Sequence, residues 1–272
     1  MAFALGPAAA EAGYGLVQFE TIGSTSAEAL SRARAGDAGP SWCVSSHQTQ
    51  GRGRRGRPWE TAAGNLASSL LLTTEVSGAV AATLGFVAGL ALSDALLRVV
   101  PHLTVRTGLD GASGRDGSRF ELKWPNDVVA GGAKIAGILL ESEGVQGGRT
   151  AIVVGIGVNV VSAPADVPYA AASLNELGGA TTAEALFAAL SDSWVSRYLE
   201  WDGGRGLDSI RNAWLSRAAG LGGPVAVKMG SNVIRGTFRT LDSDGCLIVR
   251  GQDGRDVRIA AGEVHFGTVA SA

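Results

Sequence analysis

Between residues 120 and 154, four short apolar segments follow one another with only turns between them. The apolar segments span residues 120–124, 128–129, 135–142 and 151–154. The turns that join them are rich in glycine, as at Gly131-Gly132 and 144–148. Short turns let consecutive strands pair only in opposite directions. The centre of the fold is therefore predicted to be an antiparallel meander.

Helices and further strands are predicted on both sides of this meander. Apolar residues recur at helical spacing in residues 79–100, 183–201 and 206–219, which predicts three amphipathic helices. The aromatic residues of the last two helices are expected in the core: Trp194, Tyr198 and Trp214. Strands are predicted at 15–20, 42–46 and 66–73, the last of them buried on both faces. A helix is predicted over residues 26–35, capped by Ser24 or Thr25.

The composition changes near residues 220–224, and only short strands with polar turns are predicted beyond that point. These strands span 225–229, 233–240, 246–250 and 256–260. Because so few residues in short strands favour a separate small barrel, we expect two domains, 1–221 and 222–272. Residues 107–119 lack periodicity and are predicted to be a mobile hairpin tip or insertion.

The overall charge and the cysteine and histidine content exclude several classes of function. The 272 residues carry a formal net charge of −2, which gives no global attraction to nucleic acid or anionic lipid. The two cysteines are far apart and the three histidines show no zinc-binding spacing, so no metal site is predicted. The first residues lack the basic head of a signal peptide, and no apolar run approaches the ~18–20 residues that span a bilayer. We expect a soluble, cytoplasmic protein without membrane contact.

A strongly cationic loop stands out against this near-neutral background. Four arginines and three glycines occur without any acidic residue in Gly51-Arg52-Gly53-Arg54-Arg55-Gly56-Arg57-Pro58-Trp59. Glycines let backbone N–H groups approach an anion, and arginine offers a fork of donors that stays charged. The loop is therefore predicted to capture a compact anion such as phosphate. A disordered or nucleic-acid-contacting basic turn is the alternative interpretation.

Three other segments carry polar groups at the ends of predicted elements. Ser24-Thr25-Ser26 places hydroxyls at a helix start, where they either cap the helix or bind a polar ligand group. Lys123-Trp124-Pro125-Asn126-Asp127 is followed by Lys134, so both lysines are expected on one hairpin beside the same ligand. Gly155-Ile156-Gly157-Val158-Asn159 ends a strand with two glycines that allow close approach of a flat ligand, but it is no dinucleotide fingerprint.

In this order, these segments resemble those of the biotin–protein ligases over nearly the whole chain. The resemblance rests also on Gln48 and on Lys134-Ile135-Ala136-Gly137-Ile138-Leu139. It implies an α+β fold: a mixed, mainly antiparallel central sheet flanked by helices, similar to the class II synthetases, with a small C-terminal Src-homology-3-like barrel. It also implies the form without an N-terminal DNA-binding domain, because only about twenty residues precede Ser24.

The resemblance implies a two-step reaction. Biotin is activated by ATP, with Mg²⁺ entering on the phosphates, to give biotinyl-5′-AMP and pyrophosphate. The biotinyl group then passes to one lysine of a biotin carboxyl carrier protein domain of an acyl-CoA carboxylase. No DNA partner and no membrane partner are implied, and the protein is expected to be a monomer or weak homodimer.

The matching positions imply the following site residues. The catalytic candidates, where two anions must approach each other, are Arg52, Arg54, Lys123 and Lys134. The implied biotin-binding residues are Ser24, Thr25, Ser26, Gln48, Arg52, Gly53, Arg54, Trp59, Lys134 and Gly137. The implied ATP-binding residues are Arg52, Arg54, Arg55, Asn126, Lys134 and Asn159. Trp59 is equally consistent with a structural role, and Asp127 either orients the phosphate site, assists the incoming amine or is a plain ion-pair partner.

Two alternative functions remain open from the sequence. A lipoate or octanoyl transferase of the same broad fold would share the architecture, although the arginine loop and the Lys123–Asp127 segment favour biotin. A nucleic-acid-binding regulator that uses the basic loop would show steep salt dependence.

Overall fold

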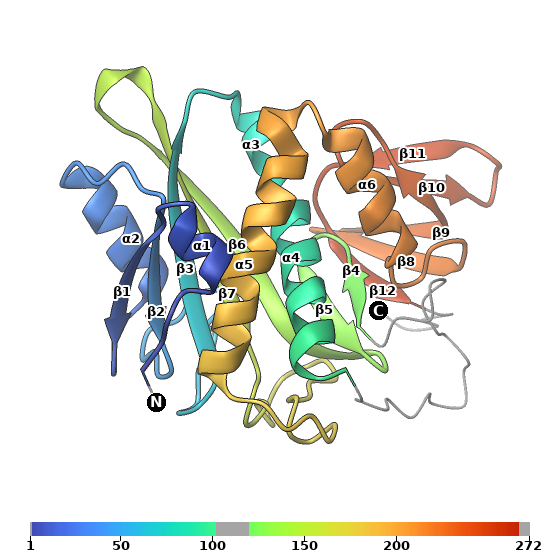
Figure 1. Cartoon of the computed structure of the whole chain (residues 1–272). Coiled ribbons are helices and arrows are strands. Elements are labelled where there is room, and N and C mark those ends of the chain that lie inside the picture. Colours follow the sequence, from blue (N-terminus) through green and yellow to red (C-terminus); the bar gives the residue numbers. More distant parts are fainter. Residues whose placement is uncertain (1, 102–119, 267–272) are drawn as a thin grey trace.

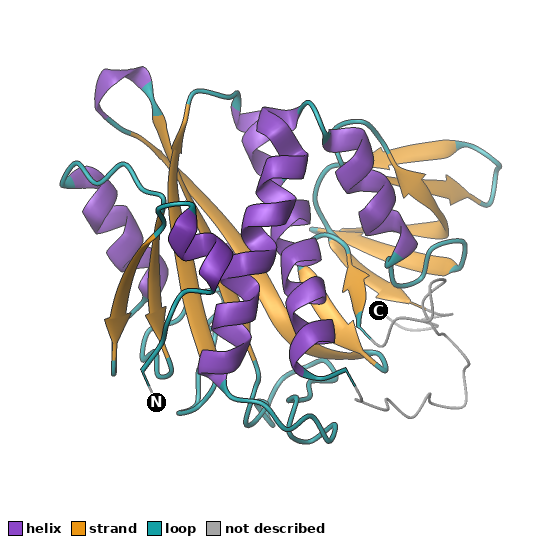
Figure 2. Ribbon diagram, in the orientation of Figure 1, coloured by secondary structure: helices purple, strands orange, loops and turns teal. Residues whose placement is uncertain are grey.

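The computed structural model describes residues 2–101 and 120–266. The predicted insertion at 107–119 lies outside the described residues. The described chain forms two sheets, with helices packed on the larger one (Figures 1 and 2).

The larger sheet has seven strands in the order β1-β2-β3-β7-β6-β5-β4. β1 pairs in parallel with β2, and every other pairing in the sheet is antiparallel. β4, β5, β6 and β7 are consecutive in the chain and pair with one another in turn, so the predicted meander is confirmed. The strand bounds are β1 Gly15–Phe19, β2 Ser41–Ser45, β3 Leu66–Thr74, β4 Glu121–Lys123, β5 Asp127–Ala130, β6 Ala133–Gly144 and β7 Thr150–Val158.

The two faces of this sheet are covered differently. α4 (Leu84–Val99) and α5 (Ala183–Trp201) lie side by side across one face (Figure 1). The opposite face packs against α2 (Thr25–Arg34) through a small separate apolar cluster that includes Ala29, Cys43 and Leu71. Successive side chains of a strand point to opposite faces. The central strand β3 is therefore buried on both faces, as predicted.

Helix boundaries follow recognisable caps. Ser24 caps α2 by accepting a hydrogen bond from the backbone N–H of Ala27, as expected. The helix predicted over 79–100 is interrupted: α3 spans Gly78–Ala82 and α4 begins at Leu84. Thr83 lies at the break, where its hydroxyl donates to the Val80 carbonyl and accepts from Trp201 Nε1 at 2.8 Å. A short helix α1, Pro7–Glu11, occupies the start of the chain, for which no element was predicted.

Residues Gly78–Val99 are long and apolar enough, by length and composition alone, to cross a membrane. This differs from the expectation that no segment approaches that length. However, 72% of the apolar window is buried within the fold, against α5 and the sheet. Such burial is what the core helix of a soluble protein shows.

The smaller sheet has five antiparallel strands in the order β11-β10-β9-β8-β12. α6 (Leu207–Ser216) leads into it, and its Trp214 lies in the core, as does Trp194 of α5. Four of the five strands were predicted, and the missing one is the last. The bounds are β8 Pro224–Met229, β9 Asn232–Leu241, β10 Leu247–Gly251, β11 Asp256–Ile259 and β12 Glu263–Phe266. The α+β class with a small C-terminal β domain is confirmed, while the boundary at 221/222 stays a prediction.

Candidate active site

A cavity of about 350 Å³ opens on the α2 side of the large sheet. Small residues of three neighbouring strands form its floor: Ser69 on β3, Gly155 and Gly157 on β7, and Gly137 on β6. Gly137 and Gly157 are register partners. Because small side chains leave the sheet surface low at this point, the space that α2 fills further along the same face is open here.

Trp59 packs directly on this glycine floor. A Cβ atom on Gly157 would lie 2.3 Å from Trp59 Nε1, and one on Gly137 would lie 3.1 Å from Trp59 Cζ3. The glycines therefore do allow close approach of a flat group, but at Gly157 that group is an indole of the chain itself. The sequence analysis predicts a ligand in this space.

The basic loop is a folded turn in which Arg52, Arg55 and Arg57 pair with acidic residues from distant segments. Gly53 N–H donates to the Arg57 carbonyl at 2.7 Å, and Arg55 adopts a left-handed conformation with φ of 59°. Arg52 lies 3.6 Å from the Glu141 carboxylate. Arg55 and Arg57 both pair with Glu263 of β12. The small C-terminal sheet thus holds the tip of the loop.

Arg54 is the most buried arginine of this loop and lines the cavity. Its Nη1 donates to Asn126 Oδ1 at 3.0 Å, while Asn126 Nδ2 donates to the Ile138 carbonyl at 2.8 Å. Burial lowers the pKa of the Arg54 guanidinium, and the neighbouring charge of Arg55 acts in the same direction. Because burial and Arg55 both disfavour the charged form of this guanidinium, an anion that enters the cavity would stabilise it.

Lys134 is surrounded by an acid and two aromatic rings. Its Nζ lies 2.7 Å from Asp127 Oδ1, 5.3 Å from the centroid of the Trp59 ring and 5.4 Å from that of Tyr169. Tyr169 belongs to a segment that runs beside the start of β6, where Lys134 N–H donates to the Ala170 carbonyl at 2.8 Å. The lysine is thereby held over the cavity from both sides.

Lys123 reaches the cavity from the end of β4, beside the C-terminal sheet. Its Nζ lies 5.3 Å from the centroid of the Phe266 ring on β12. Burial lowers the pKa of the Lys123 ammonium, an effect that nearby Asp127 opposes and Lys134 reinforces. The two lysines border the same cavity, as predicted from their hairpin.

The opposite end of the cavity is polar but uncharged. Gln48 Oε1 accepts hydrogen bonds from the Thr25 N–H at 2.8 Å and from the Thr25 hydroxyl at 3.1 Å. The Thr25 and Ser26 hydroxyls both contact the Ser69 hydroxyl. Ser24, the helix cap, lines the same end.

The structure brings nearly all predicted site residues to this one cavity. Those that line it are Ser24, Thr25, Ser26, Gln48, Arg52, Gly53, Arg54, Arg55, Trp59, Lys123, Asn126, Lys134 and Gly137. Asn159 is the exception, because it is buried and its Nδ2 donates to the Ala172 carbonyl at 3.2 Å. Its placement does not support the predicted contact with ATP.

Among the lining residues that the sequence analysis missed are Ser69, Tyr169 and Glu263. Ser69 belongs to a strand that reads as apolar, and Tyr169 to a segment without a motif. Glu263 precedes an unpredicted strand. An alternating pattern in Glu263–Phe266 is the one sequence signal that would have found β12 and with it Glu263.

Fold and cavity together define a class of protein: a mixed α+β domain that gathers cationic side chains over a glycine floor, closed by a small β domain. The chain belongs to the biotin/lipoate A/B protein ligase family, whose model matches residues 21–159. A second model, the biotin protein ligase C-terminal domain, matches residues 220–267.

Individual relatives agree with this assignment. The chain is 42% identical to a biotin–[acetyl-CoA-carboxylase] ligase of Paracoccus denitrificans, covering 90% of this chain and 97% of that protein. The biotin protein ligase of Aquifex aeolicus in complex with biotin and ATP has the same fold, with a TM-score of 0.72 at 23% identity over 93% and 99% of the two chains. The biotin protein ligase of Leishmania major in complex with biotinyl-5-AMP is 26% identical, with a TM-score of 0.61 over 91% and 99%.

Proposed function

We infer that the protein acts as a biotin–protein ligase. In the first step, the biotin carboxylate attacks the α-phosphorus of ATP, the bond to pyrophosphate breaks, and biotinyl-5′-AMP forms. In the second step, the ε-amine of a carrier lysine attacks the carbonyl carbon of this anhydride, loses a proton and expels AMP. The observation that carries this function is the gathering of Arg54, Lys123 and Lys134 around one cavity whose other end is neutral and polar.

The cationic end of the cavity is suited to the adenylation step. Two anions must meet there, and fixed positive charge offsets their repulsion and stabilises charge that develops on the phosphorus. We assign this role to Arg52, Arg54, Lys123 and Lys134. The 2.7 Å ion pair supports a role for Asp127 in orienting Lys134.

The neutral end is suited to the ureido ring of biotin, which has one carbonyl acceptor and two N–H donors. Ser24, Thr25, Ser26 and Gln48 provide hydroxyl and amide groups at this end of the cavity. We assign the ring to this end, with the backbone of Arg52, Gly53 and Arg54 above it. Trp59 and Gly137 then flank the ligand.

ATP is assigned to the side that borders the C-terminal sheet, through Arg54, Arg55, Asn126 and Lys134. We propose that Mg²⁺ enters on the ATP phosphates and supplies charge neutralisation there. Within residues 2–101 and 120–266, no group of three or more His, Cys, Asp or Glu side chains is placed to hold a metal ion. The donor set therefore suits a metal carried by its nucleotide.

The carrier substrate is proposed to be a biotin carboxyl carrier protein domain of an acyl-CoA carboxylase. We further propose a cytoplasmic monomer or weak homodimer that does not bind DNA, with domains 1–221 and 222–272. The near-neutral net charge supports the absence of a DNA partner.

The decisive experiment is mass spectrometry of a carrier domain incubated with the protein, biotin and MgATP. A gain of one biotin on one lysine is expected. No gain with biotin, together with a gain when lipoate replaces it, would instead assign the lipoate branch of the family.

A further inference from the structure

Ser69 lies at the centre of the neutral end of the cavity, on a strand whose buried residues are mostly apolar. It is the fourth residue of β3, and its side chain is fully buried. Its Oγ lies 2.8 Å from Thr25 Oγ1 and 3.0 Å from Ser26 Oγ. One buried hydroxyl therefore bridges the first two residues of α2.

The hydrogen bonds around Ser69 have a fixed direction. Gln48 Oε1 is an acceptor only, and it receives both the N–H and the O–H of Thr25. The single hydroxyl hydrogen of Thr25 is thus used, so Thr25 Oγ1 must accept from Ser69. Ser69 in turn has no hydrogen left for Ser26, which must donate to it. The three hydroxyls therefore donate in series: Ser26 to Ser69, Ser69 to Thr25, and Thr25 to Gln48.

This direction determines what the cavity offers a ligand. Both lone pairs of Gln48 Oε1 are occupied, so the amide nitrogen, a donor, is the group that Gln48 has left. Thr25 and Ser69 have used their hydrogens and keep lone pairs, which are acceptors. A donor beside acceptors complements a carbonyl oxygen flanked by N–H groups, which is the pattern of a cyclic urea.

Gly155 preserves this arrangement from the neighbouring strand. A Cβ atom at Gly155 would lie 2.8 Å from Ser26 Oγ, closer than real contacts allow. Any side chain at this position would displace the Ser26 hydroxyl and so break its hydrogen bond to Ser69.

We propose that Ser69 is a positioning residue: by donating to Thr25 it completes the Ser26–Ser69–Thr25–Gln48 row, holds the Thr25 hydroxyl on Gln48, and thereby makes the cavity selective for the ureido carbonyl. The proposal rests on the proposed function, because the ligand is taken to be biotin. Without Ser69, no donor occupies the Thr25 hydroxyl oxygen, and the Thr25 hydroxyl can turn away from Gln48 Oε1. The amide oxygen then keeps its hydrogen bond from the Thr25 N–H but has one lone pair free to accept from a ligand. Cooperativity along the row makes its members act together.

Calorimetry with biotin and with 2-iminobiotin, in which a protonated imine replaces the carbonyl, tests this proposal. Ser69→Ala is expected to raise the Kd for biotin about tenfold or more. It should also shrink the wild-type preference for biotin over 2-iminobiotin several-fold, since the freed lone pair of Gln48 Oε1 accepts from the protonated imine. An unchanged preference would overturn the proposal even if both ligands bound more weakly, because a merely structural loss affects both alike.

Two further variants separate the row from a general loss of stability. Thr25→Val combined with Ser69→Ala should weaken biotin binding little more than the more damaging single change, whereas additive effects would contradict a shared row. Ser191→Ala removes an equally buried serine hydroxyl on α5, remote from the cavity, and should leave the Kd for biotin unchanged. A wild-type protein that binds no biotin would defeat the proposed function, whereas normal binding by Ser69→Ala would defeat only this inference.

Discussion

At the scale of single residues, the site depends on side chains that are absent as much as on those that are present. Trp59 can lie over the sheet only because Gly137 and Gly157 have no Cβ atom. Lys134 then lies over the Trp59 ring. A cationic group is thus positioned through an aromatic ring that is itself positioned by a pair of glycines.

Gly157→Ala is therefore expected to displace Trp59 and with it the closing segment of the basic loop. We expect an increase of about tenfold in the KM for biotin, equivalent to ~1.4 kcal/mol, with little change in the melting temperature because Trp59 is only half-buried. Steady-state adenylation assays measure this effect. Gly144→Ala, also on a strand but with open space around its Cβ, is the matched control and should behave as wild type. A wild-type KM for Gly157→Ala would refute the role of the glycine.

Arg54→Ala is expected to raise the barrier to adenylate formation by roughly 2–4 kcal/mol, because a half-buried donor proposed to stabilise the reacting anions is lost. Lys134→Ala should behave similarly. Pyrophosphate release measures both. Arg205→Ala removes an exposed arginine that pairs with Asp202, and should have no effect. Normal pyrophosphate release by the Lys134 variant would remove this lysine from the catalytic group.

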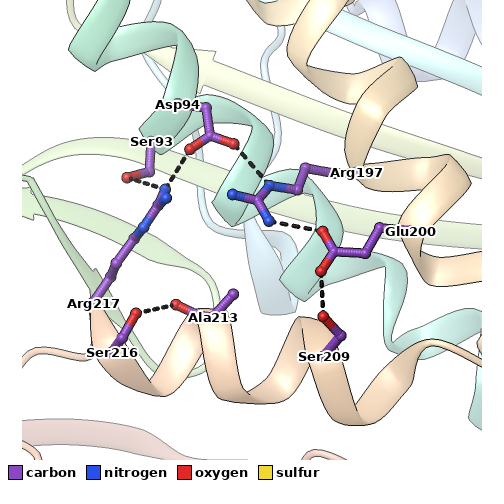
Figure 3. Close-up of polar contacts among 8 residues, drawn as sticks. All are labelled: Ser93, Asp94, Arg197, Glu200, Ser209, Ala213, Ser216 and Arg217. Atoms are coloured by element: carbon purple, nitrogen blue, oxygen red, sulfur yellow. Dashed lines mark hydrogen bonds and ion pairs between the residues drawn. The ribbon is translucent and has the colours of Figure 1, made fainter.

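At the scale of elements, a network of ion pairs joins three helices beside the edge of the large sheet (Figure 3). Asp94 of α4 accepts hydrogen bonds of 2.7 Å from both Arg197 of α5 and Arg217, just after α6. The Arg217 carbonyl in turn accepts from Leu122 N–H on β4 at 2.8 Å. The network therefore ties the helical layer to the strand that carries Lys123.

Asp94→Asn should destabilise the fold by about 2–4 kcal/mol, because two largely buried arginines lose a charged partner. Burial alone would raise the pKa of Asp94, but its hydrogen bonds with Arg197 and Arg217 outweigh this and hold the pKa below the usual 3.8. Its contribution is thus complete above pH 3.8 and is lost as the pH falls through the lower folded-state pKa. Urea unfolding at neutral and acidic pH measures both effects.

Asp208→Asn is the matched control, since Asp208 also pairs with an arginine but its side chain is 83% exposed. A change below about 0.5 kcal/mol is expected there. Equal losses in the two variants would contradict a special role for the Asp94 network.

The sequence predicts the elements of this fold better than the contacts between them. Short turns between apolar strands suffice for the meander, and helical periodicity suffices for α5. The break at Thr83 was not predictable, because it depends on Trp201, which is far away in the chain. The burial of Asn159 was not predictable for a similar reason, since its partner, the Ala172 carbonyl, lies in a segment without a motif.

At the scale of the whole molecule, the small C-terminal sheet forms one wall of the active-site cavity. β12 contributes Glu263, which binds Arg55 and Arg57, and Phe266, which lies against Lys123. Trp124 Nε1 also donates to the Gly245 carbonyl in this sheet at 3.1 Å. The basic loop and β4, the strand that carries Lys123, are therefore both held in place by contacts with the C-terminal domain.

Glu263→Gln should loosen the basic loop without unfolding the protein. These ion pairs are partly exposed and contribute at most about 1 kcal/mol each, so we expect a rise of roughly three- to tenfold in the KM for ATP. Hydrogen exchange of the amides at residues 52–57 should accelerate. Asp253→Asn removes another arginine-paired acid of the same sheet and should change neither quantity. Unaltered hydrogen exchange in the Glu263 variant would show that the loop keeps its conformation without these ion pairs.

The apolar stretch Gly78–Val99 also bears on how the chain is made. Its cover comes from β6, β7 and α5, all of which follow it in the sequence. During synthesis, this stretch leaves the ribosome long before Val158 and Trp201 do, and until then it resembles a membrane anchor. A nascent chain arrested near residue 100 is therefore the species that we expect chaperones, or the membrane insertion machinery, to recognise.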